Sequence, residues 1–515
     1  MSSRIGKSLK NAQVNVLFYI LTTILAFFSR KYFLLNLGDN FVGLSGTLGD
    51  MLNLLNITEL GIGTAVSVTL YKPLFDNDRN KINDIISVFG FLYTRVGAFI
   101  GFIGLVISCF FPIIFRDAGV PLYLPYLMFY AMLYAALLGY FVNFRQIILA
   151  ASQQNYVVML QYNTAVISKV ILQIATSFLP YNYLWWIALE AISITAFTFL
   201  INRSIRKRFP WLQASHKAGR EKFREYKGLW TKTKQVFCFK VSHLVLNSST
   251  NMLIYAFANL STVALYGNYN MVMCKITAFV DGIFTGMGAS IGNLIAEGNM
   301  EKTLKVFNEL LSIRYYLAGL CSISLYFISS PLIAIWLGEQ YIMGNHIILL
   351  LSLHIFIQQA RLTVTNFKDG YGFFEDVWAP IAEVILNLGM AILLGYFMGL
   401  SGILAALILS QGLIKMLWQP YYLFANGFRC SVLHCYWPLI LKYAGILGAV
   451  ILATIPFNKF CSNTFLYGSW MSLILYCVVI GGFVFILLTL FFLITDSSFR
   501  IFICHMLEYL KRRNK

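Results

Sequence analysis

The sequence predicts an all-α integral membrane protein with about fourteen transmembrane helices, arranged as two parallel six-helix lobes followed by two C-terminal helices. Three observations lead to this prediction. Hydrophobic residues make up 59% of the 515 residues and charged residues only 12%, whereas soluble domains are about 45–50% apolar and about 25% charged. The mean hydropathy is +0.71. Apolar runs of about 20 residues, long enough to span a bilayer as helices, recur throughout the chain.

Polar residues, glycine and proline delimit each predicted helix. The predicted spans are 12–35, 41–72, 84–112, 121–143, 154–179, 183–203, 235–258, 261–295, 303–330, 345–365, 377–398, 401–424, 437–457 and 467–494. The first span follows Arg4, Lys7 and Lys10, but no small-residue cleavage site comes after it. We therefore interpret it as a retained transmembrane helix and not as a signal peptide.

Basic residues are distributed unequally between the connections. The connection at 203–234 alone contains eleven Lys or Arg and two Glu. The termini and the other connections on the same side of the membrane hold most of the remaining basic residues outside the spans. By the positive-inside rule, this side is cytoplasmic and both termini lie on it. The net charge of +18 therefore reflects topology and attraction to anionic lipid headgroups, and nucleic-acid binding is not expected.

The two six-helix halves share the same order of features, which is typical of transporters built from parallel repeats. The segment FVGLSGTLGD (41–50) opens the second span, and VALYGNYNMV (263–272) opens the eighth. Paired glycines follow at matching places, Gly61 with Gly63 and Gly286 with Gly288. They permit either close helix contact or a bend. The predicted domains are an N-terminal lobe (1–203), a basic cytoplasmic linker (204–234), a C-terminal lobe (235–425), and two further helices with a basic cytoplasmic tail (426–515).

Ionisable residues inside the spans point to a solvated interior, because each is costly in hydrocarbon unless protein or water solvates it. They are Arg30, Asp50, Glu59, Arg95, Lys169, Glu190, Lys240, Lys275, Asp281, Arg361, Glu383 and Lys415. In spans one, two, seven, eight and ten, polar residues recur at helical spacing and so share one face. We predict that these stripes line a water-filled cavity between the lobes. Hydrogen bonding between packed helices is the alternative for any single residue.

The predicted cavity is cationic and suits an anionic substrate. Its predicted substrate-binding residues are Lys275, Arg361, Arg30, Lys240, Asn247 and Gln358. Arginine suits phosphate in particular, because its planar fork binds two oxygens at once. Arg30 and Lys240 could instead extend to the membrane interface.

Three carboxylates, Glu59, Asp281 and Asp50, are predicted to form ion pairs or to couple transport to an ion. Glu59 lies about 180° from Asp50 around an ideal helix. It could pair with a base on a neighbouring helix or carry a coupling proton, and the sequence leaves both open. No cofactor is expected beyond H⁺ or Na⁺ as a coupling ion.

Metal and enzyme chemistry are not expected. The nine cysteines include no CxxC pair, and the group Cys430, His434 and Cys435 matches no metal-binding framework. A glycan polymerase or acyltransferase is the non-transport alternative. The predicted outward connections are short, and no Ser/His/Asp, HxxxD or DxD constellation stands at a membrane surface. The sequence therefore favours a protein that is not an enzyme.

Two segments carry a family resemblance. Residues 37–82 contain an E-x-G sequence after an apolar helix, and residues 369–413 contain a Gly-Leu-Ser-Gly-Ile turn. In these features, in its predicted helix number and in its basic linker, the chain resembles the polysaccharide-exporter branch of the multidrug/oligosaccharidyl-lipid/polysaccharide exporter superfamily.

The resemblance implies a flippase in the bacterial cytoplasmic membrane. Its cargo would be an undecaprenyl-pyrophosphate-linked oligosaccharide repeat unit for O-antigen (lipopolysaccharide), capsule or exopolysaccharide. Other polysaccharide-assembly membrane proteins and membrane lipids would be its partners. Lys275 would correspond to the basic residue of the eighth helix that meets pyrophosphate in peptidoglycan-precursor relatives, and Arg30 to that of the first helix. The chain has fewer arginines on its first two helices than those relatives.

A cation-coupled multidrug exporter of the same superfamily is the alternative function. Its cargo is commonly cationic, so carboxylates should dominate the cavity. The basic excess favours the flippase.

Overall fold

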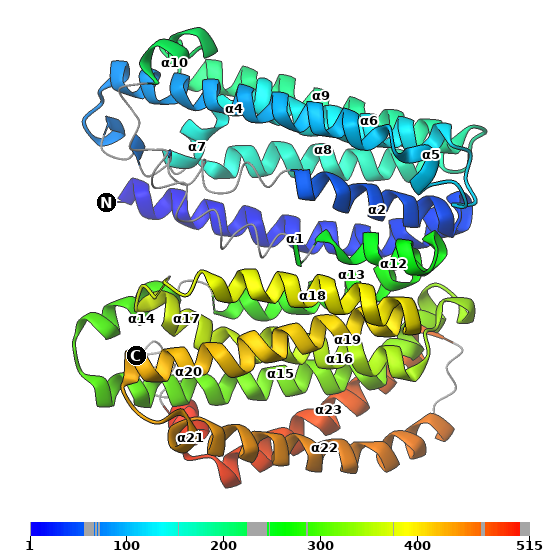
Figure 1. Ribbon diagram of the computed structural model, residues 1–515, viewed down its shortest axis with the longest axis vertical. Coiled ribbons are helices and arrows are strands. Elements are labelled where there is room, and N and C mark those ends of the chain that lie inside the picture. Colours follow the sequence, from blue (N-terminus) through cyan, green and yellow to red (C-terminus); the bar gives the residue numbers. More distant parts are fainter. Residues whose placement is uncertain are drawn as a thin grey trace. The chain divides into compact units, whose positions relative to one another are not determined.

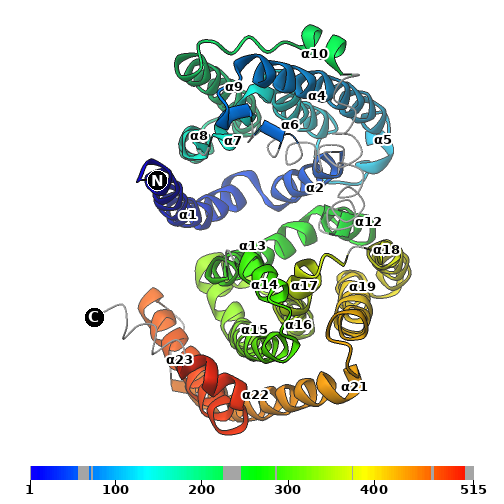
Figure 2. The ribbon, with the colours of Figure 1, turned by 90° about the vertical axis from the view of Figure 1, so that its left-hand side faces the viewer.

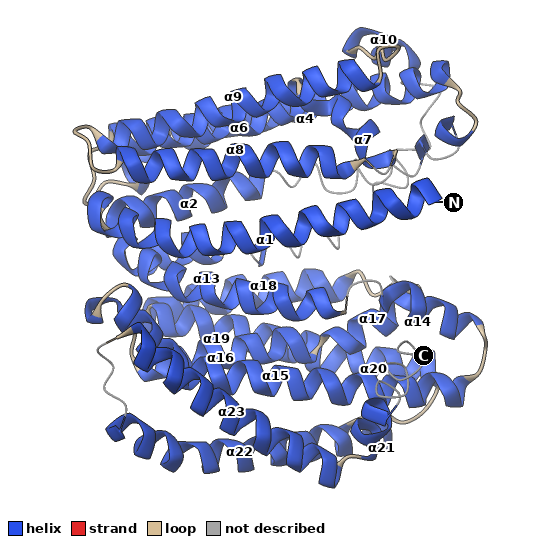
Figure 3. Cartoon of the chain, turned by 180° about the vertical axis from the view of Figure 1, so that it is seen from behind, coloured by secondary structure: helices blue, strands red, loops and turns tan. Residues whose placement is uncertain are grey.

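The computed structural model describes residues 2–55, 66, 69–70, 73–152, 154–223, 245–246, 248–284, 287–373, 375–464 and 469–504. Within these ranges all regular secondary structure is helical, as Figure 3 shows. Eleven of the described helices are long and apolar enough to cross a membrane. They coincide with eleven of the fourteen predicted spans. The predicted all-α, multi-pass membrane fold is therefore confirmed.

The remaining three predicted spans are only partly described. Residues 56–65 of the second span and 235–244 of the seventh lie outside the described part of the chain. The eighth span, 261–295, corresponds to two consecutive helices, α13 (Leu260–Ile283) and α14 (Met287–Ala296). The glycines Gly61, Gly63 and Gly286 also lie outside the described residues, so the choice between a close contact and a bend stays open.

The contacts divide the chain into two compact units, Met1–Ala264 and Leu265–Lys515. The predicted lobes, with a linker at 204–234 between them, stay a prediction. Residues 204–208 are the last residues of the helix Asn182–Arg208, and a separate helix spans His216–Lys222.

The first unit is a helical bundle (Figure 1). Its elements are α1 (Ser2–Leu37), α2 (Asp39–Leu55), α4 (Arg79–Ser108), α5 (Phe111–Ile114), α6 (Tyr123–Phe141), η2 (Asn143–Gln146), α7 (Ile147–Ala151), α8 (Asn155–Thr176), α9 (Asn182–Arg208), α10 (His216–Lys222) and α12 (Thr250–Phe257). Gly38 separates α1 from α2 with a φ of 81°, which glycine adopts without steric cost. Asp78 caps α4 by accepting a hydrogen bond from the Lys81 N–H.

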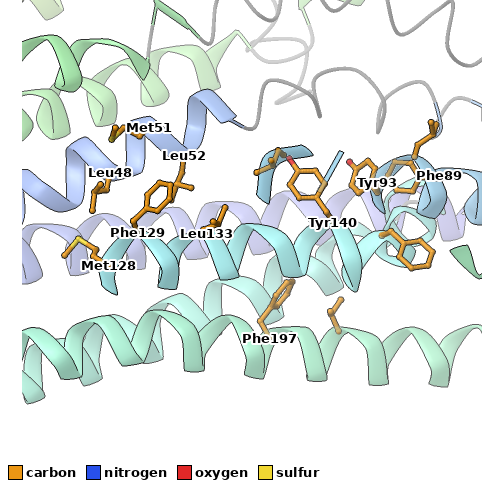
Figure 4. Packing of buried hydrophobic residues seen from close by; sticks show 14 of the residues in the cluster. Leu48, Met51, Leu52, Phe89, Tyr93, Met128, Phe129, Leu133, Tyr140 and Phe197 are labelled. Atoms are coloured by element: carbon orange, nitrogen blue, oxygen red, sulfur yellow. The ribbon is translucent and has the colours of Figure 1, made fainter. Parts of the chain in front are cut away.

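The apolar face of α2 packs into the core of this unit. Leu48 and Leu52 lie one turn apart on α2 and are buried. Figure 4 shows them beside Phe129 and Leu133 of α6. Spacings of four residues place such pairs on one helix face, so apolar periodicity alone explains this contact.

The longest described helix of the second unit is α15 (Met300–Trp336), and other helices of the unit pack against it (Figure 2). Its elements after α13 and α14 are α15 (Met300–Trp336), η3 (Glu339–Tyr341), α16 (Asn345–Ala360), α17 (Leu362–Gly370), α18 (Trp378–Met398), α19 (Leu400–Gln411), η4 (Gly412–Trp418), α20 (Gln419–Leu423), η5 (Phe424–Phe428), α21 (Val432–Cys435), α22 (Trp437–Thr464) and α23 (Trp470–Thr495). The helices α16, α22 and α23 all contact α15. Polar groups from several of these helices meet in the interior of the unit.

A tight backbone contact in the first unit gives a test of the packing. A Cβ added at Gly43 would overlap the backbone carbonyl of Leu260. We expect Gly43→Ala to lower the melting temperature of the purified protein, at a cost of about 1–3 kcal/mol, because backbone must move. Gly49→Ala on the same helix is the control, since no described atom lies within 4 Å of its added Cβ. Equal melting temperatures for the two variants would contradict this packing.

Candidate functional site

Ionisable side chains from five helices and two connections lie close together in the second unit. We call the following set the charged cluster: Asp281, Arg314, Arg361, Lys368, Asp376, Glu383 and Lys415. They come from α13, α15, the junction of α16 and α17, α17 itself, the residues before α18, α18, and η4. Arg361 and Lys415 interact electrostatically with each other and with carboxylates of the cluster. The cluster therefore acts as one electrostatic system.

Two lysines of the charged cluster are held by buried carboxylates. The Lys415 Nζ lies 2.8 Å from the Glu383 Oε2, and the Glu383 side chain is only 1% exposed. Lys368 pairs with Asp376, which also accepts a hydrogen bond from the Trp418 indole N–H at 3.3 Å. Lys415 and Trp418 both lie on η4, a π-helical turn, and such turns are frequent at functional sites.

Arg314 is satisfied in a different way. Its side chain is 4% exposed, and its Nη1 donates to the Gln359 Oε1 at 2.9 Å. The same nitrogen lies 3.5 Å from the Asp281 Oδ1. The guanidinium carbon stands 3.5 Å from the ring centre of Phe284, a cation–π distance. The contacts with Gln359 and Phe284 hold Arg314 inside the unit, whereas the Asp281 side chain is 52% exposed and its contact with Arg314 is long.

Arg361 differs from the other cations of the charged cluster, each of which lies within ion-pair distance of a carboxylate. It is half-buried at the break between α16 and α17, and its Nε is buried without a hydrogen-bond partner among the described residues. Its guanidinium forms no ion pair within 4.0 Å in the described part of the chain. Glu383, Asp281 and Asp369 are nevertheless within electrostatic range. A buried polar group without a partner costs about 1–3 kcal/mol, which an incoming acceptor would recover.

Of the nine predicted site residues, four lie in the described part of the second unit, two lie in the first unit and three lie outside the described residues. Asp281 and Arg361 both belong to the charged cluster. Gln358 lies on α16 and donates to the His354 Nε2 at 2.9 Å. Lys275 is half-buried on α13, the helix that also carries Asp281. Lys240, Asn247 and Glu59 lie outside the described residues.

The other two predicted residues lie in the first unit. The Arg30 Nη2 donates to the backbone carbonyl of Ala264 at 2.8 Å. The Asp50 Oδ2 accepts a long hydrogen bond, 3.4 Å, from the Asn251 N–H. Asp50 is half-buried and has no Lys or Arg within ion-pair distance among the described residues. The predicted cavity between the lobes stays a prediction.

Asn268 of the predicted eighth span and His354 of the tenth belong to the predicted polar stripes and are buried inside the second unit. Asn268 is fully buried, and His354 is 6% exposed. His354 bonds to Gln358 of its own helix, so the choice between a cavity and hydrogen bonding between packed helices stays a prediction. The predicted positive excess is also small within the charged cluster, where most cations have a carboxylate partner.

Sequence reasoning missed several ionisable residues that the structure shows to be buried. Arg314 lies within the predicted span 303–330, so the rule applied to Arg361 would have identified it. Lys368 falls between the predicted spans 345–365 and 377–398, in a connection expected to be cytoplasmic, but it is 3% exposed inside the unit. Asp496 is 1% exposed and accepts from the Lys442 Nζ at 2.7 Å, which ties α22 to the end of α23. No sequence spacing signals such pairs, since their partners are distant along the chain.

Metal ligands do not gather in the described ranges, where no group of three His, Cys, Asp or Glu side chains could hold an ion. The absence of a metal site stays a prediction.

Comparison with known proteins identifies the fold. No protein-family model matches the chain, and no curated protein matches its sequence. The inward closed structure of the lipid II flippase MurJ is similar, with a TM-score of 0.65 and 14% identity over 93% of this chain and 99% of that one. An inward-facing multidrug resistance MATE family transporter of the MOP superfamily has a TM-score of 0.58 and 15% identity, over 80% of this chain and 98% of its own. An outward-facing structure of such a transporter has a TM-score of 0.55 and 13% identity, over 81% and 96%. This chain therefore has the fold of MOP superfamily transporters, as the resemblance predicted.

The pair between Glu383 and Lys415 can be tested directly. Glu383→Gln should destabilise the folded protein by about 3 kcal/mol, because it leaves the Lys415 charge uncompensated in a buried place. The double variant Glu383→Gln/Lys415→Met should recover most of this loss, since it removes the unpaired charge. Thermal unfolding of the purified proteins in detergent measures both. If the double variant melts no higher than the single one, the pair does not account for the loss.

Proposed function

We propose that this protein is a flippase that moves an undecaprenyl-pyrophosphate-linked oligosaccharide across the bacterial cytoplasmic membrane for surface polysaccharide biosynthesis. Arg361 is the observation that carries the proposal. The pyrophosphate binds its guanidinium, Lys275 adds a second positive charge, and the prenyl chain stays in the lipid. Both termini are cytoplasmic in this proposal, and the sugar faces the cytoplasm before transport.

The state of Arg361 supports an anionic ligand. Two of the three carboxylates that interact electrostatically with Arg361 have basic partners of their own, Asp281 with Arg314 and Glu383 with Lys415. The third, Asp369, forms no ion pair with Arg361 within 4.0 Å in the described part of the chain. Arg361 therefore keeps unused donors close to a buried network. Phosphate oxygens fit these donors well, because charge-assisted bonds from a guanidinium to phosphate are often bidentate. Binding would supply the acceptor that the Nε lacks among the described residues.

The similarity to known structures supports a flippase more than a multidrug exporter. The lipid II flippase covers 93% of this chain. The two multidrug transporter structures leave about a fifth of it unmatched, which is enough to hold α22 and α23. Similarity to both inward- and outward-facing structures is also consistent with transport by alternating access.

Asp50 favours the second candidate, the cation-coupled multidrug exporter. It is a half-buried carboxylate without a basic partner in the described part of the chain, so it could bind a cationic cargo. In a flippase the same carboxylate would instead bind the coupling H⁺ or Na⁺. The two functions therefore differ in which cation occupies Asp50.

Arg361→Gln should reduce transport by about 10- to 100-fold without loss of folded protein, because it removes a charged hydrogen-bond donor worth about 1.5–3 kcal/mol. In cells that lack the gene, lipid-linked saccharide should accumulate facing the cytoplasm, and the extracted fraction is measured. Supplying the wild-type gene should relieve this accumulation, and supplying Arg361→Lys should relieve it partly. Lys305→Gln is the charge-matched control, since this exposed lysine lies on α15 of the same unit. Normal transport by folded Arg361→Gln would refute the assignment of Arg361.

Asp50→Asn should abolish the response of transport to an imposed pH or Na⁺ gradient, because a neutral amide neither accepts a proton nor balances the charge of Na⁺. Flipping in reconstituted vesicles, with and without each gradient, measures this response. Wild-type cells should gain no resistance to cationic dyes if the protein is a flippase. Dye resistance that depends on Asp50, without accumulation of lipid-linked saccharide in the deletion strain, would identify the multidrug exporter instead.

A further inference from the structure

The first unit contains a pocket, and none of the residues of the charged cluster lines it. It has a volume of about 640 Å³, within the range of ligand sites, about 300–1,000 Å³. The end of α6, η2, α9 and α10 form its walls. Four basic or titratable side chains line it, Arg145, Arg203, Arg206 and His216, and no Asp or Glu is among its described lining residues.

The positive charge of this pocket comes from three arginines, and hydrogen bonds fix one of them in place. The Arg145 Nε and Nη2 donate to the Ala214 carbonyl at 3.2 and 2.8 Å, which fixes the half-buried guanidinium. Burial lowers the pKa of Arg145, and the positive charge of Arg206 lowers this pKa further. An anion between the two guanidinium groups would relieve their repulsion.

The basic part of the pocket adjoins an apolar surface. Phe199, Arg203 and Arg206 follow one another at four and three residues on α9, so they share one face of the helix. Phe199 is 66% exposed and Phe141, at the end of α6, is 37% exposed. The positive-inside rule predicts that this end of α9 is cytoplasmic, where basic side chains meet lipid headgroups.

His216 closes the wall of the pocket and anchors α10. Its Nδ1 lies 2.7 Å from the Thr94 Oγ1 and 2.9 Å from the Gly90 carbonyl, both on α4. Its Nε2 lies 3.2 Å from the Phe141 carbonyl. Gly219 brings α10 against the Ser87 backbone of α4, where a Cβ would overlap. The pocket is thus a built feature of folded helices.

We propose that this pocket binds the phosphate headgroup of an anionic phospholipid, with Arg203 and Arg206 contacting the phosphate and Arg145 supporting them from the wall. An acyl chain lies along Phe199 and Phe141. The exposed phenylalanines favour a lipid over free phosphate, because an acyl chain would bury their apolar surface and a small anion would not. This lipid site is separate from the proposed cargo site, and its test does not depend on transport.

The test measures thermal stabilisation of the purified full-length protein in detergent. Phosphatidylglycerol is added in mixed micelles, with phosphatidylcholine of the same acyl chains and inorganic phosphate in parallel. Phosphatidylglycerol should raise the melting temperature saturably, and the other two should not. The double variant Arg203→Gln/Arg206→Gln should raise the half-saturating lipid concentration by about 10- to 30-fold, because each lost charge weakens binding by up to about fivefold.

The control is Lys207→Gln/Lys217→Gln, which loses the same charge from exposed residues that do not line the pocket. This variant should keep the wild-type half-saturating concentration. Equal weakening in both double variants would overturn the proposal in favour of general surface attraction. Equal stabilisation by phosphatidylcholine or by inorganic phosphate would overturn it too. The melting temperatures without lipid report whether each variant folds.

Discussion

Charges placed inside a membrane protein need partners, and this requirement shapes both units of the chain. An ionisable group in hydrocarbon costs at least about 2.5 kcal/mol at the bilayer centre. The described helices meet this cost mainly by pairing across elements. In the first unit the Lys169 Nζ on α8 contacts both Glu190 oxygens on α9, at 2.8 and 2.9 Å. In the second unit Glu383 holds Lys415, and Asp496 holds Lys442.

Such pairs specify which helices lie together more than they stabilise the fold. The desolvation of two charges offsets most of their attraction, so a buried pair contributes little net free energy, whereas breaking one costs several kcal/mol. A helix that slid or rotated out of register would leave both partners unpaired. The pairs therefore act against wrong helix arrangements, while apolar contacts such as those between α2 and α6 supply the packing. Within this scheme a charged group that lacks an ion-pair partner among the described residues, such as Arg361 or Asp50, indicates a role beyond folding.

The sequence predicted the parts of this arrangement that depend on local composition. The eleven described spans were found because an apolar run of membrane length leaves its backbone no alternative to a helix. Asp281 and Arg361 were identified because a charge in such a run is rare. The pairing of charges could not be predicted, because it depends on which helices are neighbours and how each is rotated about its axis. The π-helical turn that carries Lys415 and the burial of Lys368 beyond the predicted end of a span likewise depend on tertiary contacts.

In the proposed function, the cargo and the coupling ion act on the two charged groups that have no ion-pair partner among the described residues. An anion on Arg361 removes an unsatisfied donor from the second unit, and a cation or proton on Asp50 removes a carboxylate charge from the first. Each binding event lowers the cost of a buried charge in one unit without altering the paired charges around it. A ligand can shift a conformational equilibrium only by its difference in affinity between the states. In the proposed alternating-access cycle, the environment of Arg361 and of Asp50 therefore differs between the inward- and outward-facing states, whereas the pair between Glu383 and Lys415 stays closed throughout.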